Sequence, residues 1–487
     1  MGIVSKTSIK FSIILFVGIA LGYINTVLIF PNVLTEEEFG LTRILMSASA
    51  VIAQLAQLGS PNIIVHFHPH LKGDKKNITL SIGLLISLVG LFLALVFLLI
   101  FDNYVISLYQ EKSELFARYF YLLLPYITSL IFYNLFDAYL RVVFKNNVSA
   151  FLNFILLRIL WLAVVGLYYF EYLSTASFIK VYVACQFFIA LTALGYIIHL
   201  RKLHISFRFN RERFQLLKKM YHFGVFTIIS GISIFLINRI DILMVGKYVG
   251  LEGVAIYSIA FYISSVIMVP AQSISRTAIV LAANAAKNND LKTVASLYKK
   301  TALNQLLFCS IIFILIVINY KNLMYFLPVI YRDSFLIFLL LGLAKVVETG
   351  FGINGGIIIN SKYFRVDTFL SIILLLLTVA SNLYFIPSFG IQGAATATMI
   401  SIVIFNVLRY LFLKIKLNLD PFTWQYLGVI FILSGSATLT YIVPSLSSVW
   451  TDMITRSILF LILSVPTIYL LKLSPELNKL VNNVLPL

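Results

Sequence analysis

The sequence predicts an all-α polytopic membrane protein, and three observations support this fold class. Of its 487 residues, 60% are apolar and 11% are charged, whereas soluble proteins are about 45–50% apolar and about 25% charged. Apolar runs of about 20 residues, the length that crosses a bilayer, recur along the whole chain. Basic residues outnumber acidic ones 37 to 19 and gather in alternate connections. A soluble enzyme, a fibrous protein and a disordered chain are therefore excluded.

The apolar runs predict about fourteen transmembrane helices. The first lacks a small-residue cleavage site, so we expect a retained signal anchor. The longest connection, 201–221, leaves no room for a soluble domain. The expected spans are 8–30, 40–65, 78–101, 117–141, 148–169, 177–200, 222–246, 253–276, 298–319, 334–359, 366–386, 391–413, 424–444 and 454–472.

The basic residues predict the orientation of these helices. With a cytoplasmic N-terminus, 26 of the 37 Lys and Arg residues fall on the cytoplasmic side and 6 on the outer side. This bias is typical of multi-pass membrane proteins, and it places both termini in the cytoplasm. The topology accounts for most of the net charge of +18, so no nucleic-acid partner is expected.

An internal repeat divides the predicted helices into two lobes. Residues 11–60 and 226–275 are identical at fourteen of 50 positions without a gap. Six helices separate the two copies, and an even number gives both lobes the same orientation, an arrangement that secondary transporters use. The expected parts are an N-terminal six-helix lobe (1–200), a basic cytoplasmic linker (201–221), a C-terminal six-helix lobe (222–415) and two additional helices with a cytoplasmic tail (416–487).

Polar side chains occupy one face of the second predicted helix. Steps of three and four residues place Arg43, Ser47, Gln54 and Gln57 on this face. The matching helix of the second lobe carries Ser265, Gln272 and Arg276. A polar face is costly in lipid, so we expect both faces to line a central cavity. Hydrogen bonds that only hold the helices together are the alternative.

Charged residues inside three further helices are candidates for substrate binding. Arg158 lies at mid-depth in the fifth predicted helix, where it can pair with a carboxylate or attract an anionic substrate. The seventh ends in Asn238, Arg239 and Asp241. Asp241 falls on one stripe with Asn238 and is a candidate for the cavity and for cation coupling. Structural ion pairing of Asp241 is an equal alternative.

The tenth predicted helix contains Lys345 and Glu348, which are three residues apart and can pair. A carboxylate at this depth can titrate or bind a coupling cation, so Glu348 is a coupling candidate. A neutralised structural pair is the alternative. Asp137 and Arg141, four residues apart, are expected to pair with each other.

The sequence predicts no metal, no cofactor and no catalytic site. The alternating histidines after the second helix can suggest a metal site, but their spacing suits a strand, and they lie at a helix end that contains Pro69. A cluster of three glutamates is expected in a short solvated outer loop, without the outer domain that a sugar transferase needs. These residues are His66, His68, His70, Glu36, Glu37 and Glu38.

Three segments resemble a known family. The run Leu34-Thr-Glu-Glu-Glu-Phe-Gly40, followed by a helix to Gln57-Leu-Gly-Ser-Pro61, is similar to the first helix pair of polysaccharide transporters. These belong to the multidrug/oligosaccharidyl-lipid/polysaccharide exporter superfamily. The segments Asn238–Asp241 and Leu251–Ser258 resemble the signature of the family's second half. The segment Tyr384–Ala395 resembles the family's turn between helices 11 and 12.

The resemblance implies two six-helix lobes around a central cavity in the bacterial inner membrane. It implies export by alternating access of an undecaprenyl-pyrophosphate-linked oligosaccharide, for O-antigen and lipopolysaccharide synthesis. Membrane lipids and other polysaccharide-assembly membrane proteins are the implied partners. A lipid II flippase and a cation-coupled multidrug antiporter remain open as alternatives. Cationic cavities are typical of the flippases, and the candidates here are Arg43, Arg158, Arg239, Arg276 and Lys345.

Overall fold

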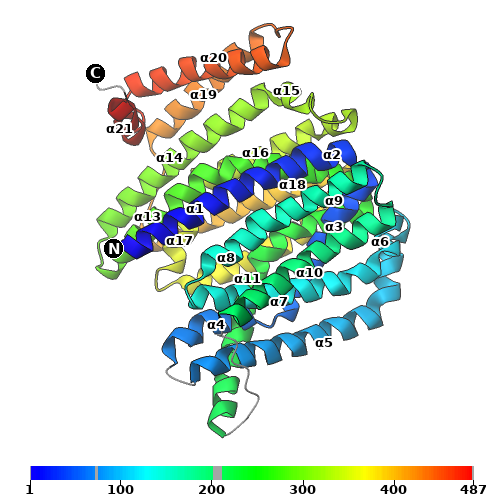
Figure 1. Ribbon diagram of the computed structural model, residues 1–487. Helices are drawn as coiled ribbons and strands as arrows, with labels where there is room; N and C mark the ends of the chain where they lie inside the picture. Colours follow the sequence, from blue (N-terminus) through cyan, green and yellow to red (C-terminus); the bar gives the residue numbers. More distant parts are fainter. Residues whose placement is uncertain (1, 72–74, 201–210, 485–487) are drawn as a thin grey trace. The chain divides into compact units, whose positions relative to one another are not determined.

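The computed structural model describes residues 2–71, 75–200 and 211–484 (Figure 1). Within these ranges the chain is helical and contains no strand. Eleven of the described helices are long and apolar enough to cross a membrane. The predicted all-α, multi-pass membrane fold is therefore confirmed.

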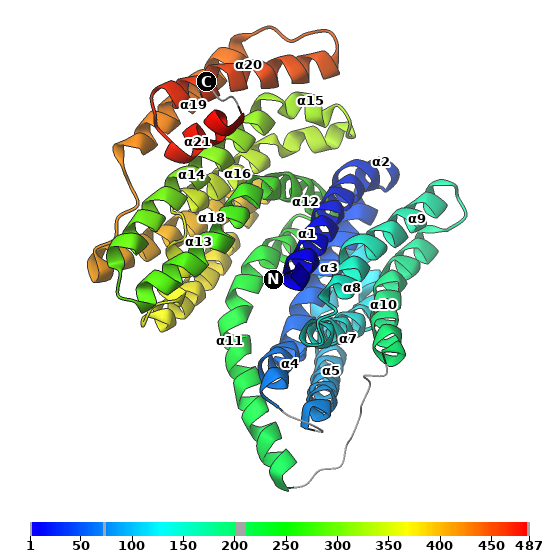
Figure 2. The same ribbon diagram turned by 60° about the vertical axis from the view of Figure 1, so that its left-hand side comes forward.

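The described chain forms two compact units, Met1–Ala255 and Ile256–Leu487. In the first unit, α7 packs against α3, α4, α5 and α10, while α1 packs against α8 and η4 (Figure 2). Its elements are α1 (Gly2–Tyr23), η1 (Ile24–Ile29), α2 (Phe30–Val33), α3 (Glu36–Ala56), α4 (Ser60–Phe67), η2 (His68–His70), α5 (Lys75–Gln110), α6 (Glu114–Arg118), η3 (Phe120–Leu122), α7 (Leu123–Val142), α8 (Asn146–Phe151), η4 (Leu152–Leu156), α9 (Leu157–Tyr169), α10 (Thr175–His199) and α11 (Arg211–Tyr248).

The second unit begins within α12 (Leu251–Ser265) and is organised around α14, α16 and α18. Its further elements are η5 (Val266–Met268), α13 (Val269–Lys287), α14 (Leu291–Ile318), α15 (Tyr320–Met324), η6 (Val329–Ser334), α16 (Phe335–Gly350), α17 (Asn354–Ile359), α18 (Phe364–Leu417), α19 (Trp424–Ile442), α20 (Val449–Leu470) and α21 (Pro475–Val484).

All fourteen predicted spans fall in helical structure, but several have breaks that the sequence pattern did not indicate. Helix α18 contains two predicted spans, joined at a kink where Gly390 has a φ of 58°. The span predicted at 334–359 is divided between α16 and α17 around Gly352, also at a φ of 58°. A Cβ on Gly352 would lie 2.8 Å from the backbone nitrogen of Ala302, so a side chain there would separate this break from α14.

The segment 40–65, predicted as one helix, is two helices. Helix α3 ends at Ala56 and α4 begins at Ser60, with Leu58 and Gly59 in the left-handed region between them. The second half of the predicted linker is also helical and not a loop. Residues 211–221 form the start of α11, whereas 201–210 lie outside the described residues.

The expectation of a solvated glutamate loop is wrong, because Glu36, Glu37 and Glu38 form the first turn of α3. Thr35 accepts a hydrogen bond from the backbone of Glu38, whose carboxylate accepts one from the Thr35 nitrogen. This reciprocal arrangement is a capping box. Glu38 is only 5% exposed, and its Oε1 also accepts hydrogen bonds from the hydroxyls of Tyr168 and Thr175, at 2.7 and 2.9 Å.

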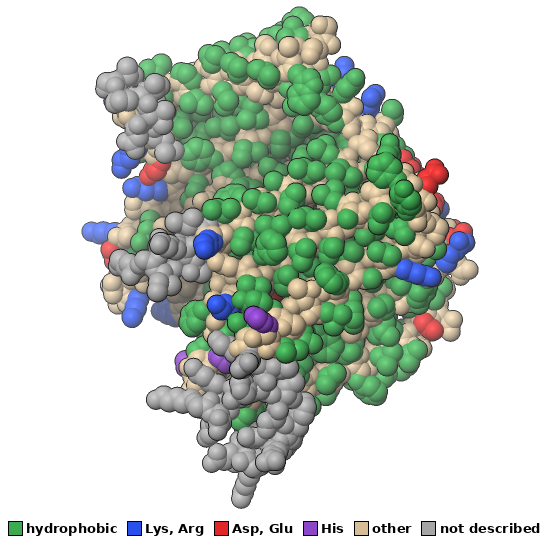
Figure 3. All heavy atoms as spheres, in the orientation of Figure 1, with side chains coloured by type: hydrophobic (Ala, Val, Ile, Leu, Met, Phe, Trp, Pro, Cys, Tyr) green, Lys and Arg blue, Asp and Glu red, His purple; other side chains and the backbone are tan. Residues whose placement is uncertain are grey.

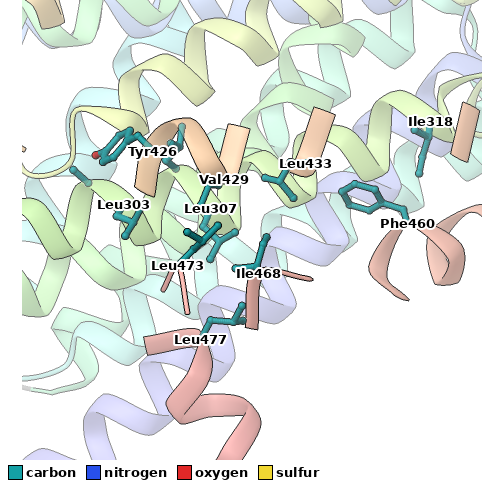
Figure 4. Close-up of a cluster of buried hydrophobic side chains, with 12 residues drawn as sticks. Leu303, Leu307, Ile318, Tyr426, Val429, Leu433, Phe460, Ile468, Leu473 and Leu477 are labelled. Carbon is teal, nitrogen blue, oxygen red and sulfur yellow. The ribbon is translucent and has the colours of Figure 1, made fainter. Parts of the chain in front are cut away.

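The C-terminal helices pack on α14 through one apolar cluster (Figure 4). Its members include Leu303 and Leu307 of α14, Val429 and Leu433 of α19, and Phe460 of α20. On the molecular face of Figure 3, apolar side chains cover the helices, and charged side chains lie toward the helix ends. That distribution suits helices surrounded by hydrocarbon.

Candidate functional site

Three arginines of the first unit gather around one buried tyrosine. Arg43 of α3, Arg158 of α9 and Arg239 of α11 all lie within electrostatic reach of the Tyr126 hydroxyl on α7. Tyr182 of α10 lies in the same group. Five helices thus bring together three side chains that the sequence singled out separately. We call Arg43, Arg158 and Arg239 the arginine cluster.

Arg43 is the most enclosed member of the arginine cluster, with 1% of its surface exposed. Its Nη2 donates a hydrogen bond to the Tyr182 hydroxyl at 2.9 Å. Its guanidinium carbon lies 5.4 Å from the ring centre of Phe30 and 5.3 Å from that of Phe39. Aromatic faces attract a guanidinium, more strongly when water is excluded. The aromatic residues therefore hold this charge in a fixed place.

Arg158 is half-buried and is connected to Arg43 through aromatic side chains. Its guanidinium carbon lies 5.2 Å from the ring centre of Trp161. Trp161 stacks on Tyr182, with ring centres 4.7 Å apart and planes at 14°, and donates a hydrogen bond from Nε1 to the Tyr182 carbonyl. Tyr182 in turn accepts the hydrogen bond from Arg43. A displacement of either ring would affect both arginines.

Sequence reasoning missed the aromatic part of this site. Trp161 follows Arg158 by three residues, a spacing that places two side chains on one helical face, so this contact had a local signal. Tyr126 and Tyr182 had none, because they reach the arginine cluster from other helices. In an apolar span, the sequence does not distinguish a tyrosine that contacts a buried arginine from one that only packs in the core.

The polar face predicted on the second helix is mostly enclosed. Ser47 and Gln57 are buried and Gln54 is half-buried. Gln57 donates a hydrogen bond to the side-chain oxygen of Gln54 at 2.6 Å and accepts one from Asn134 of α7 at 3.3 Å. These contacts agree with the alternative of interhelical hydrogen bonding for the glutamines. A cavity-lining role for this face stays a prediction.

The last predicted residues of the first unit lie on α11. Arg239 is half-buried, and Asp241 is buried at 4% exposure. The side chain of Asn238 lies outside the described part of the structure.

The matching polar face of the second unit is open. Ser265 at the end of α12 and Gln272 and Arg276 of α13 are all exposed within their unit. Exposed polar groups at membrane depth need water or protein beside them, not lipid. This exposure supports the expectation that α13 lines a polar space.

Carboxylates hold basic side chains in the second unit. Lys345 Nζ lies 3.2 Å from Glu348 Oε2, which confirms the predicted pair. Arg409 of α18 lies 2.7 Å from Asp367 Oδ1, and its guanidinium carbon lies 4.0 Å from the ring centre of Phe405. The sequence missed this second pair because its members are 42 residues apart on the two halves of the kinked helix α18. In the first unit, Asp137 and Arg141 pair at 2.9 Å, as predicted.

The two family-like signatures of the first unit meet at the predicted outer ends of the helices. A Cβ on Gly40 would collide with the carbonyl of Leu251. Close by, the Ser113 hydroxyl donates a hydrogen bond to the Gly246 carbonyl at 2.6 Å. Gly40 thus permits the close approach of the segment that starts α12.

Comparison with known families decides the classification. A family model described as "Polysaccharide biosynthesis protein" matches residues 8–280, more than half of the chain. The chain belongs to this family. A second model, described as MatE, matches residues 227–382. No curated protein matches the sequence.

Solved structures agree on the fold. The lipid II flippase MurJ in an inward closed conformation is 16% identical, with a TM-score of 0.72, covering 95% of this chain and 99% of that one. An inward-facing multidrug resistance MATE transporter is 16% identical, with a TM-score of 0.66 and coverages of 83% and 94%. A superfamily transporter from Pyrococcus furiosus is 15% identical, with a TM-score of 0.54 and coverages of 85% and 96%. These likenesses show that the chain has the fold of these membrane transporters.

Proposed function

We propose that this transporter flips a lipid-linked oligosaccharide, carried on undecaprenyl pyrophosphate, across the bacterial inner membrane by alternating access. The product would serve surface polysaccharide synthesis, such as that of O-antigen, and both termini would be cytoplasmic. The observation that carries the proposal is the arginine cluster around Tyr126. Together with the family match over 8–280, it favours a substrate that is a lipid-linked anion.

The chemistry of the substrate agrees with this cluster. A pyrophosphate-linked sugar is large, polar and charged, so crossing about 30 Å of hydrocarbon unaided is prohibitive. Guanidinium groups bind phosphate oxygens through paired, charge-assisted hydrogen bonds. Asp241 is buried on the same helix as Arg239, yet three arginines still outnumber it. The half-buried Arg158 and Arg239 are the members that we assign to phosphate contact, with Arg43 as the enclosed third charge.

The remaining polar candidates receive supporting roles. Gln272, Ser265 and Arg276, exposed on their unit, would contact sugar hydroxyls or phosphate. Asp241 and Glu348 are the candidates for coupling to a cation. Glu348 already has Lys345 as a partner, so a coupling cation would have to compete with that ammonium group.

Deletion of the gene, followed by analysis of carrier lipids and surface glycan, tests the proposal. We expect lipid-linked repeat units to accumulate on the cytoplasmic leaflet while surface polysaccharide is lost. Accumulation of a peptidoglycan precursor would identify a lipid II flippase instead. Unchanged glycans with altered drug sensitivity would identify an antiporter. Complementation with Arg158→Ala should fail to restore export, and restoration would contradict the assigned role of Arg158.

A further inference from the structure

Two glycines of the first helix lie against the helix that carries Arg158. Gly18 and Gly22 of α1 are four residues apart, and so are the residues that they meet, Phe154 and Arg158. A Cβ on Gly18 would lie 2.5 Å from Phe154 Cβ and 2.7 Å from its carbonyl oxygen. A Cβ on Gly22 would lie 3.5 Å from both Cζ and Nε of Arg158. Glycines at this spacing let two membrane helices approach closely.

Asn25 extends the same contact by nearly one turn. Its Nδ2 donates a hydrogen bond to the backbone carbonyl of Arg158 at 2.8 Å, and its side chain is fully buried. A carbonyl oxygen can accept a second hydrogen bond besides that of its own helix. The Asn25 amide therefore fixes the register of the first helix at the arginine itself.

The local backbone on both sides is π-helical. The segment η1 (Ile24–Ile29) contains Asn25, and η4 (Leu152–Leu156) ends two residues before Arg158. A π-helical turn takes an extra residue and rotates the next part of the helix about its axis, and such turns occur often at functional sites. Both turns adjoin the contact between α1 and α9. They determine which way Asn25 and Arg158 face.

The Arg158 guanidinium is thus contacted by two elements. The glycine positions of α1 lie against its Cζ and Nε, and the ring of Trp161 lies 5.2 Å from its Cζ. A side chain larger than alanine at position 22 would occupy the space that the guanidinium now fills. Arginine is a long, flexible side chain, so it would move before the helices did.

We infer that Gly18, Gly22 and Asn25 are positioning residues for Arg158, and that the first helix controls through them how tightly the substrate's pyrophosphate is held. This inference rests on the proposed function for its ligand. Its geometric part, the placement of the guanidinium by the first helix, stands on the contacts alone. The two parts can be tested separately.

Tryptophan fluorescence tests the placement. The sequence has three tryptophans, so Trp424→Phe with Trp450→Phe leaves Trp161 as the reporter. We expect Gly22→Leu to shift Trp161 emission, because the guanidinium leaves its ring. Gly22→Ala should not shift it, since a Cβ there makes only ordinary contact. Gly195→Leu is the matched control, as a Cβ on Gly195 meets nothing within 4 Å.

Binding of undecaprenyl pyrophosphate to the purified full-length protein, measured by native mass spectrometry, tests the ligand. Loss of a charge-assisted contact should weaken binding at least about tenfold in Gly22→Leu and in Arg158→Ala. The double variant should bind no more weakly than Arg158→Ala, because both changes act through one side chain. Asn25→Leu, which keeps the volume but removes the donor, provides a second variant if Gly22→Leu does not fold.

The outcomes separate the two ideas. An unchanged Trp161 emission in both Gly22→Leu and Asn25→Leu would overturn the positioning role. Additive losses of binding in the double variant would do the same. If Arg158→Ala binds undecaprenyl pyrophosphate as well as wild type does, while Gly22→Leu still shifts the Trp161 emission, then pyrophosphate is not the ligand of Arg158. That result would count against the proposed function and leave the placement intact.

Discussion

The two units hold the basic side chains within their helices differently. In the first unit, arginines from three helices gather around Tyr126, and Arg43 is held by a tyrosine hydroxyl and two phenyl rings. In the second unit, Arg409 and Lys345 each have a carboxylate within 3.2 Å or less. The contacts of Arg43 thus include aromatic rings and hydroxyls, whereas Arg409 and Lys345 each lie within ion-pair distance of a carboxylate. The difference teaches that the fold places a basic side chain inside a helical unit in more than one way.

Residues related by the repeat show the same contrast. Gln57 is buried and hydrogen-bonded to Gln54 and Asn134. Its repeat partner Gln272 is exposed on α13. Identical side chains therefore have structural contacts in one unit and an exposed position in the other. A sequence repeat does not by itself imply shared roles for the matching residues.

The two buried cysteines allow each unit to be followed separately. Cys185 lies in the first unit and Cys309 in the second. In single-cysteine variants, a thiol-reactive dye labels each cysteine only when its surroundings unfold. The labelling temperature then reports the stability of one unit.

The largest effect is expected from breaking the buried pair of the second unit. Asp367→Ala leaves Arg409 buried without its carboxylate, which costs about 3–5 kcal/mol. The labelling temperature of Cys309 should therefore fall more than that of Cys185. Lys300→Ala is the control, because its pair with Glu476 is exposed and such pairs contribute about 0–1 kcal/mol. An equal fall in the labelling temperatures of both cysteines would contradict the local neutralisation of Arg409 by Asp367.

A smaller effect is expected from the corresponding change in the first unit. Tyr182→Phe removes the hydroxyl that accepts from Arg43 but keeps the ring that stacks on Trp161. Hydrogen bonds to charged groups contribute about 1.5–3 kcal/mol, so Cys185 should label at a lower temperature. Tyr172→Phe, at an exposed tyrosine, should change nothing. A Tyr182→Phe variant as stable as wild type would show that the other contacts of Arg43, which include two phenyl rings and the Thr42 hydroxyl, hold it without this hydrogen bond.

The sequence could predict the parts of this molecule that depend on local pattern. Apolar length indicated the spans, and spacing indicated the pairs of Lys345 with Glu348 and of Asp137 with Arg141. It could not predict the pair of Arg409 with Asp367, because that contact depends on how two helices meet. The break after Ala56 was missed for a related reason. Gly59 at this break allows the backbone of α11 to approach closely. Nothing in the sequence of the segment itself indicates that approach.

The same limit applies to the arginine cluster. Each arginine was recognisable as a charge in an apolar run, which is costly and therefore informative. Their convergence on Tyr126 was not recognisable, because it results from the packing of five helices. The predicted cavity-facing position of Arg43 also depended on the helical face alone. In the structure the aromatic residues around it leave 1% exposed.

The smallest effect is expected at the helix starts that the repeat relates. Thr35 caps α3 with its side chain, whereas the matching position 250 is a glycine with a φ of 117°, a conformation that L side chains rarely adopt. Thr35→Ala should cost about 1 kcal/mol, and Thr35→Gly only a few tenths, because glycine is itself a fair N-cap residue. The Cys185 labelling temperature should thus rank Thr35→Gly above Thr35→Ala. The reverse order would mean that the hydrogen bonds of Glu38 to Tyr168 and Thr175 hold this helix start without the cap.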